Sequence, residues 1–170
     1  MISNRLETCR IELVPRNEGL LLWCRENVRS KAEMKRLIDT ITDDMVREGY
    51  PENEIAYVHL ALEEAIVNAH KHGHQGDWSK ELAVRYHVNA AIAVAQVEDQ
   101  GTGFEPEEVP DPLAPENMER PTGRGLLLIR SFMTRVCHNG QGNCVCFCKH
   151  GRGRQLTDGQ TETSTRKEEN

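Results

Sequence analysis

The sequence lacks any apolar run of the length that crosses a membrane. A membrane-spanning helix needs about 20 predominantly apolar residues, whereas the stretch GLLLWC at 19–24 is short and lies in a strand-like pattern. The N-terminal MISNRLETCR also lacks the apolar core of a secretory signal. We therefore expect a cytoplasmic protein that makes no membrane contact and keeps its six cysteines reduced.

The chain also lacks an excess of positive charge. Its 21 Lys and Arg residues are outnumbered by 27 Asp and Glu residues, which gives a formal net charge of -6. Because binding to a phosphate backbone requires a basic face, this balance argues against a general nucleic-acid-binding protein. A chain of 170 residues, 38% hydrophobic and 28% charged, is instead typical of one soluble globular domain that needs no disulfide or metal for stability.

Apolar residues alternate or form short runs in six segments, which is the pattern of β-strands. The predicted strands cover residues 8–14, 20–28, 82–88, 91–98, 134–138 and 143–149. Helical spacing predicts three helices, at 30–49, 51–73 and 125–133. The first would begin at Ser30, with Glu33 as its capping-box partner, and end at Gly49. This order indicates an α+β fold, a two-layer α/β sandwich whose mixed, mostly antiparallel sheet carries helices on one face.

Composition divides the chain into three parts. Residues 1–20 form an N-terminal extension with an extra strand, residues 21–150 hold the globular domain, and the polar tail at 151–170 is expected to be disordered. Within the domain, residues 101–121 contain five of the seven prolines, so no regular element is expected there. Loops of that length are usually functional or disordered.

Three histidines alternate in the stretch LEEAIVNAHKHGHQGD, at positions 70, 72 and 74. The pattern suggests zinc, but successive helical residues turn by about 100°, so His70 and His72 point to nearly opposite sides. Only His70 and His74 share a face, and no Cys-x-x-Cys or H-E-x-x-H follows to supply further ligands. We therefore expect histidines that are solvated or that cap the helix C-terminus.

Another stripe of the same helix carries groups better suited to chemistry. Glu64, Asn68 and His72 are spaced four residues apart, so they share one face that borders the apolar stripe. A carboxylate in this setting can accept a proton, and an amide oxygen can hold a hard cation. A solvated helix face would have the same spacing, so this stripe alone does not identify a site.

The segment VEDQGTGF at 97–104 adds an acid at the end of a buried strand. Asp99 can accept a hydrogen bond from a planar amine, while Gly101 and Gly103 let the backbone approach a flat ligand. Acidic residues followed by glycine are common in turns, so the D-x-G-x-G spacing is a weak signal by itself.

The segment RPTGRGLLLIRSF at 120–132 places two glycines before an apolar helix. Gly123 and Gly125 leave free backbone N–H groups at the start of this helix, an arrangement that suits a phosphate. A plain junction between loop and helix would need only one glycine.

In this order and spacing, the three segments resemble the nucleotide-binding boxes of the GHKL (Bergerat-fold) superfamily of ATPases and kinases. The E-x-x-x-N helix looks like the N-box, DQGTGF like the first glycine box, GRGL like the second, and the proline-rich segment between them like the ATP lid. Within the superfamily, EEAIVNAHKHG and RPTGRGLLLIRSFM are most similar to the bacterial anti-sigma-factor serine/threonine kinases. The similarity covers roughly residues 21–149 and implies a GHKL-type ATP-binding kinase domain at 21–150.

This resemblance implies a role for each matching residue. Glu64 would be the catalytic base on the incoming serine hydroxyl, Asn68 the Mg²⁺ ligand, and Asp99 the acid that recognises adenine. Arg124 would add charge to the phosphates or face a partner, and Asn143 stands where the family tends to have a threonine near adenine. The residues expected to contact the nucleotide are Asn68, His72, Asp99, Gly101, Gly103, Arg120, Gly123, Arg124, Gly125, Leu126 and Asn143.

The resemblance also implies cofactors and partners. ATP and Mg²⁺ would be the cofactors; a sigma factor and an anti-anti-sigma protein with a STAS domain would be the partners, the latter phosphorylated on serine, and the kinase would be a homodimer. The alternative is a non-catalytic ATP/ADP-binding switch module that sequesters a sigma factor or another partner.

The cysteines leave open a metal- or redox-sensing protein. Cys144, Cys146 and Cys148 alternate on one face of the last predicted strand, with Val145 and Phe147 on the other face, toward the helices. Small, half-buried core residues would show the same pattern, and we expect these cysteines to be of that kind.

Overall fold

The computed structural model describes residues 23–104 and 124–151. Outside these residues lie several regions on which the sequence made predictions: the strand at 8–14, the extension at 1–20, most of the proline-rich segment, Arg120, Gly123 and nearly all of the polar tail. In chain order the elements are β1 (Cys24–Val28), α2 (Lys31–Arg47), α3 (Glu52–Asn68), η1 (Ala69–Gly73), β2 (Leu82–Val88), β3 (Ile92–Glu98), α4 (Arg124–Phe132), β4 (Arg135–His138) and β5 (Cys144–His150).

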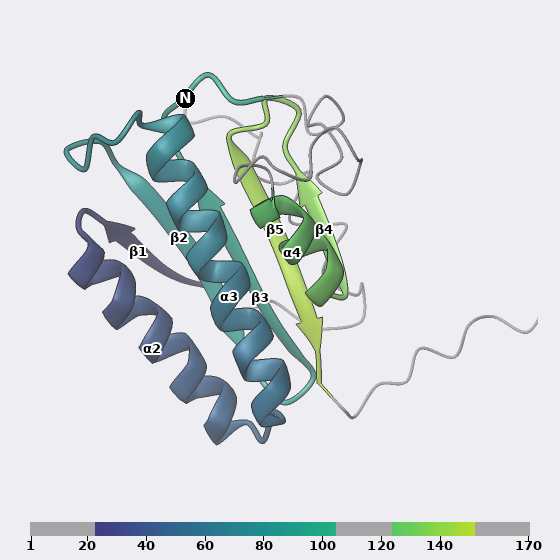
Figure 1. The fold of residues 1–170 in the computed structure, drawn as a ribbon. Helices are drawn as coiled ribbons and strands as arrows, with labels where there is room; N and C mark the ends of the chain where they lie inside the picture. Colours follow the sequence, from purple (N-terminus) through teal and green to yellow (C-terminus); the bar gives the residue numbers. More distant parts are fainter. Residues whose placement is uncertain (1–22, 105–123, 152–170) are drawn as a thin grey trace, which may run out of the picture.

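The described strands form one five-stranded sheet in the order β1-β2-β3-β5-β4 (Figure 1). Each of the four pairings between these strands is antiparallel. Because β3 occupies the centre, its end at Glu98 lies beside the start of β5 at Cys144. This pairing brings two loops that are about 40 residues apart in sequence to the same edge of the sheet.

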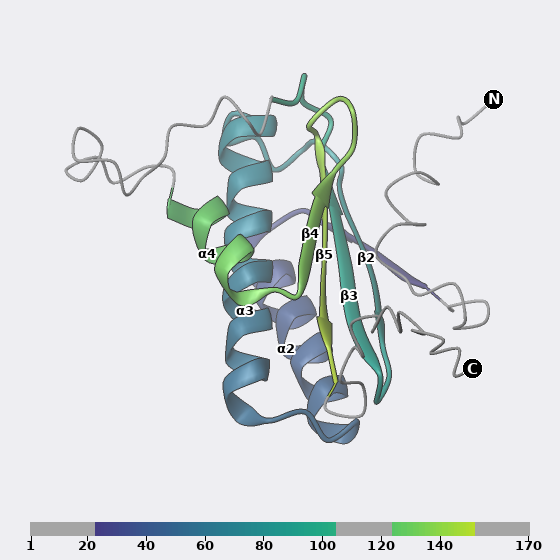
Figure 2. The same ribbon diagram turned by 90° about the vertical axis from the view of Figure 1, so that its right-hand side faces the viewer.

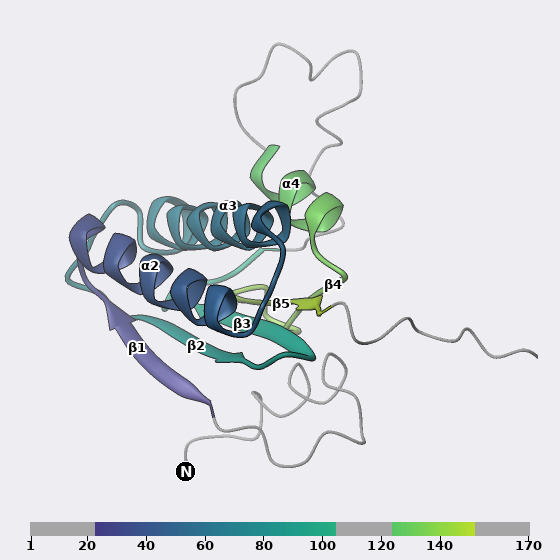
Figure 3. The same cartoon turned by 90° about the horizontal axis from the view of Figure 1, so that it is seen from below.

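All three helices pack on one face of the sheet, and the edge-on views separate the two layers (Figures 2 and 3). Between the layers lies the main core, to which α2, α3 and the sheet contribute apolar side chains. Its largest fully buried members include Ile41, Met45, Leu62, Ile66, Leu82 and Phe147. The predicted α+β sandwich is therefore confirmed, and burial of this apolar surface is the main force that holds the helices on the sheet.

The opposite face of the sheet carries a second, smaller cluster of Ile92, Val94, Cys146 and Cys148. The predicted division of the last strand is confirmed, because Phe147 belongs to the helix-side core. The cysteines are fully buried, however, rather than half-buried. Burial raises the pKa of the Cys148 thiol to about 11, which keeps it protonated and unreactive at neutral pH.

Local sequence signals fix the ends of α2. The Ser30 hydroxyl accepts a hydrogen bond from the Glu33 N–H at 3.1 Å, as predicted. The Glu33 carboxylate reaches back to the N–H of Arg29 at 2.7 Å, one residue before the usual capping-box partner. At the other end Gly49, with φ +80°, reverses the chain so that the Tyr50 N–H bonds the Met45 carbonyl.

The helix α3 continues into a π-helical turn, η1, which the sequence did not reveal. The His74 N–H donates to the Ala69 carbonyl five residues earlier, at 2.9 Å. His74 is only 1% exposed, and the His70 ring stacks on Trp78 with centroids 3.7 Å apart. His74 is the C-cap residue of η1, as the capping alternative predicted, although its side chain is buried rather than solvated. The His70 ring packs on Trp78, and His72 is exposed, as expected of a solvated histidine.

Across residues 23–104 and 124–151, no helix combines the length and the apolar character that a membrane crossing requires.

Candidate nucleotide-binding site

The predicted N-box and second glycine box meet where α3 faces the start of α4. A Cβ added to Gly125 would overlap Oε2 of Glu64 and lie 3.1 Å from Nδ2 of Asn68. Glu64 and Asn68 are half-buried, whereas Glu63 is exposed. The structure thus brings a carboxylate and an amide of α3 directly against the second residue of α4.

Contacts at the far end of α4 hold the helix in this position. The rings of Tyr57 and Phe132 stack with centroids 4.5 Å apart and planes inclined by only 4°. The Lys149 ammonium donates to the Phe132 carbonyl at 2.9 Å and lies 5.4 Å from the centre of the Tyr57 ring. A cation at a helix C-terminus is favourable, so Lys149 both caps α4 and links it to α3 and β5.

The other residues predicted near the second glycine box are placed only in part. Arg124 is exposed at the first position of α4, and Leu126, at the third position, is half-buried. Arg120 and Gly123 lie outside the described residues. Nucleotide contacts by these four residues therefore remain predictions.

Asp99 lies directly after β3, at the opposite end of the candidate site. Its Oδ1 accepts the N–H of Gly101 at 2.7 Å, which turns the chain sharply behind the strand. A Cβ added to Gly73 would overlap the Asp99 carboxyl group, so this group lies directly beside the backbone of η1. Burial raises the pKa of the Asp99 carboxyl above its ordinary value, and the hydrogen bond from the Gly101 N–H opposes this shift.

The first glycine box packs backbone to backbone against the turn between β4 and β5. Gly103 and Gly142 have φ of +80° and +76°, a region that favours glycine. A Cβ on Gly103 would overlap the Gln141 carbonyl, and one on Gly142 would overlap the Phe104 carbonyl. At Gly103 the close backbone approach is to a turn of the protein itself, while the predicted approach to a flat ligand remains a prediction.

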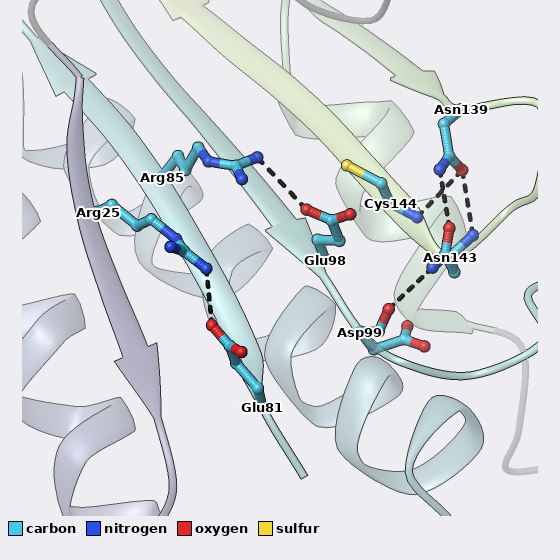
Figure 4. A network of polar contacts seen from close by, with 8 residues as sticks. All are labelled: Arg25, Glu81, Arg85, Glu98, Asp99, Asn139, Asn143 and Cys144. Carbon is cyan, nitrogen blue, oxygen red and sulfur yellow. Dashed lines mark hydrogen bonds and ion pairs between the residues drawn. The ribbon is translucent and has the colours of Figure 1, made fainter. Parts of the chain in front are cut away.

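Asn143 connects this turn to Asp99 (Figure 4). Its side-chain Nδ2 donates to the Asp99 carbonyl at 2.8 Å, and its own carbonyl accepts the Asp99 N–H at 3.0 Å. Asn139 completes the network by donating Nδ2 to Oδ1 of Asn143 at 2.7 Å and by accepting the N–H groups of Asn143 and Cys144. Asn143 therefore holds the main chain of Asp99, while its predicted contact with the nucleotide remains a prediction.

Three further residues shape the site without having been predicted there. Gly73 abuts Asp99, His74 bonds the next peptide, and Asn139 braces Asn143. The sequence held partial signals: Gly73 lies between two histidines, and Asn139 and Asn143 are four residues apart in a glycine-rich turn. Neither signal indicates a role until the strand order brings β3 beside β5.

The oxygen donors of α3 suit a magnesium ion shared with a nucleotide. In the part of the chain that the structure describes, no three His, Cys, Asp or Glu side chains converge as a metal cage. Mg²⁺ does not require such a cage, because it keeps several waters and binds through one or two protein oxygens together with phosphate oxygens. The amide of Asn68, beside Glu64 and Gly125, fits that requirement.

Known proteins contain the same set of segments. A family model of the histidine kinase-like ATPase domain matches residues 29–149, from the start of α2 to the end of β5. The serine-protein kinase RsbW of Listeria innocua is 29% identical over 126 residues, which cover 70% of this chain and 80% of that protein. The corresponding kinase of Bacillus subtilis is 27% identical over 124 residues, which cover 69% and 78%. The resemblance drawn from the motifs is confirmed, and the chain belongs to the histidine kinase-like ATPase domain family.

Proposed function

We propose that the chain is an ATP-dependent protein serine/threonine kinase that acts as an anti-sigma regulatory factor. The observation that carries this proposal is the position of the Glu64 carboxylate against Gly125, because it sets a proton acceptor beside the backbone turn suited to phosphates. Relatives named serine-protein kinase RsbW support the same reaction. Phosphoryl transfer depends mainly on positioning and charge, which this arrangement can supply.

The residues divide the reaction between them. Asp99 would accept a hydrogen bond from the amino group of adenine, and Gly101 and Gly103 would flank the base. At the other end, Glu64 would accept the proton of a serine hydroxyl as its oxygen bonds to the γ-phosphorus and the bond from that phosphorus to the bridging oxygen of ADP breaks. Magnesium, held by Asn68 and phosphate oxygens, would neutralise charge on the phosphates.

The proposed partners follow from the family resemblance. The phosphorylated protein would be an anti-anti-sigma protein with a STAS domain, and a sigma factor would be bound by a homodimer of this chain. Arg124, exposed at the first position of α4, would add charge to the phosphates or face a partner. The acidic net charge of -6 is compatible with protein rather than nucleic-acid partners.

Transfer of labelled γ-phosphate from ATP to a purified STAS-domain protein tests the kinase proposal. We expect Glu64→Gln to lower the transfer rate by at least about 100-fold, the usual contribution of a general base. Glu63→Gln is the matched control, because Glu63 is exposed and should leave the rate unchanged.

Two other outcomes separate the alternatives. If the wild-type protein binds ATP but transfers no phosphate, the kinase proposal fails and the non-catalytic switch remains. A Glu64→Gln variant that retains the full transfer rate would remove Glu64 from the role of base. Sequestration of a sigma factor that survives Glu64→Gln would separate partner binding from catalysis.

A further inference from the structure

His74 is one of two buried polar or charged residues within the described part of the chain, with an exposed fraction of 1%. Its Nε2 atom accepts a hydrogen bond from the backbone N–H of Gln100 at 3.2 Å. Its Nδ1 atom is buried and has no hydrogen-bond partner among the described residues. Burying an imidazole in this way costs free energy, so the position invites a functional explanation.

The hydrogen bond fixes the state of the ring. A nitrogen that accepts an N–H carries no proton, so the neutral His74 ring holds its proton on Nδ1. Gln100 directly follows Asp99, and the bond therefore anchors the peptide that sets the direction of the Asp99 side chain. Gly73, next to His74, leaves no space beside the Asp99 carboxyl group. The π-helical turn thus acts on the Asp99 loop through two adjacent residues.

The other bonds to Asp99 act on different atoms. Gly101 holds Oδ1, and Asn143 holds the main-chain groups of Asp99. The Gln100 peptide lies between these two anchors, and His74 supplies its bond from a different layer of the fold. Removing that acceptor would release the peptide that joins Asp99 to Gln100.

We propose that His74 is a positioning residue that sets the selectivity of the site for adenine. It acts through Asp99: the hydrogen bond from the Gln100 N–H to His74 Nε2 holds the Asp99 carboxylate where it can accept a hydrogen bond from the amino group of the base. This inference rests on the proposed ATP-binding function. It predicts that His74 contributes only to recognition of the 6-amino group and not to binding of the rest of the nucleotide.

Paired substitutions isolate the acceptor from the bulk of the ring. In His74→Gln the side-chain Oε1 reaches the position of Nε2 and can still accept the Gln100 N–H. In His74→Asn the shorter amide reaches only the position of Nδ1, and the bond is lost. His70→Phe is the matched control, because it keeps the stacking on Trp78 and lies in the same turn.

Direct binding of ATP and of purine riboside triphosphate, which lacks the 6-amino group, provides the measurement. We expect His74→Asn to weaken the binding of ATP about tenfold and to leave the binding of the purine analogue unchanged, because only a hydrogen bond to the amino group is disturbed. His74→Gln should retain the wild-type preference for ATP, and His70→Phe should not alter it. Thermal unfolding of each variant, recorded in parallel, separates loss of fold from loss of selectivity.

The outcomes are distinguishable. Equal weakening of both nucleotides in His74→Asn would show a merely structural histidine and overturn the proposal. Identical behaviour of the Gln and Asn variants would also overturn it, because the acceptor would then be irrelevant. If the wild-type chain binds neither nucleotide, the ATP-binding function itself fails, and the role of His74 fails with it.

Discussion

The two ends of the candidate site are built in different ways. At the Asp99 end, backbone groups of three segments distant in sequence meet: the π-helical turn, the first glycine box and the turn between β4 and β5. At the Glu64 end, the described contacts are between side chains of α3 and the first turn of α4. One end is fixed by main-chain geometry, and the other by how two helices pack.

This difference has a consequence for how the protein can work. Main-chain contacts without room for a Cβ hold a pocket in shape before any ligand arrives, and such preorganisation lowers the cost of binding. Side chains on two helices can shift when α4 moves. We therefore expect nucleotide binding and phosphoryl transfer to be separable by substitution, with recognition depending on the Asp99 end and the reaction rate on the Glu64 end.

The largest expected effect comes from Gly125→Ala. The added methyl group would occupy the position of the Glu64 carboxylate, which is the flexible end of a side chain and can move away without unfolding the protein. We expect the rate of phosphoryl transfer to fall by about 100-fold or more, because the proposed base is displaced, while the unfolding midpoint changes little.

Gly140→Ala is the control for Gly125→Ala, because a Cβ at Gly140 meets no atom within 4 Å. It should leave both rate and stability unchanged. A Gly125→Ala variant that transfers phosphate at the wild-type rate would contradict the placement of Glu64 as the base. Strong loss of ATP affinity without loss of the maximal rate would reverse the division between the two ends.

Asp99→Asn should have the next largest effect, confined to binding. The amide keeps an acceptor for the Gly101 N–H but replaces the second carboxylate oxygen with a donor. Loss of one hydrogen bond to a charged group corresponds to about 10- to 100-fold weaker ATP binding. Titration calorimetry with ATP measures this loss, and the transfer rate at saturating ATP should change far less.

The same substitution should stabilise the protein without ligand. Because the folded-state pKa of Asp99 is raised by burial, the folded state holds the proton more tightly than the unfolded state. Stability therefore falls as the pH rises through the two pKa values, and the full cost is present at neutral pH. Asp99→Asn removes that cost, so its unfolding midpoint should exceed that of the wild type at pH 7 and converge with it below about pH 4. If the midpoint of Asp99→Asn at pH 7 equals or falls below that of the wild type, burial of the Asp99 carboxylate does not destabilise the folded protein.

The sequence predicted the Glu64 end better than the Asp99 end. Glu64 and Asn68 lie on a regular helix whose apolar stripe is easily recognised, so their shared face follows from spacing. The family resemblance assigned these residues and Gly125 to one nucleotide site, but their direct contact was not predicted, because it depends on how α4 packs on α3. Spacing alone carries no information on contacts between elements.

At the Asp99 end the sequence identified the acid and its glycines but not what surrounds them. The burial of the His74 side chain was not predicted, because no sequence pattern indicated the π-helical turn that begins at Ala69. Gly73 was taken as the end of a helix, although its missing Cβ is what accommodates Asp99. The bracing by Asn139 depends on β3 pairing with β5, a long-range pairing that local patterns do not specify.

Asn143→Ala offers the smallest and most discriminating change. Asn143 donates to the Asp99 carbonyl and accepts from Asn139, so alanine removes two hydrogen bonds but leaves the main-chain bond from the Asp99 N–H to the carbonyl of residue 143. If the Asp99 end is held mainly by its backbone, ATP binding should weaken only about three- to tenfold, since one modest hydrogen bond contributes about 1 kcal/mol.

Asn143→Thr decides what that loss means. Threonine, the residue that the resemblance leads us to expect at this place, can donate a hydroxyl hydrogen bond but is too short to bond both Asp99 and Asn139. Recovery of ATP affinity by threonine with no recovery of the unfolding midpoint would assign Asn143 a direct part in binding the base. Recovery of neither would leave it as a brace for Asp99, and a loss with alanine as large as that of Asp99→Asn would mean that side chains, rather than the backbone, hold this end of the site.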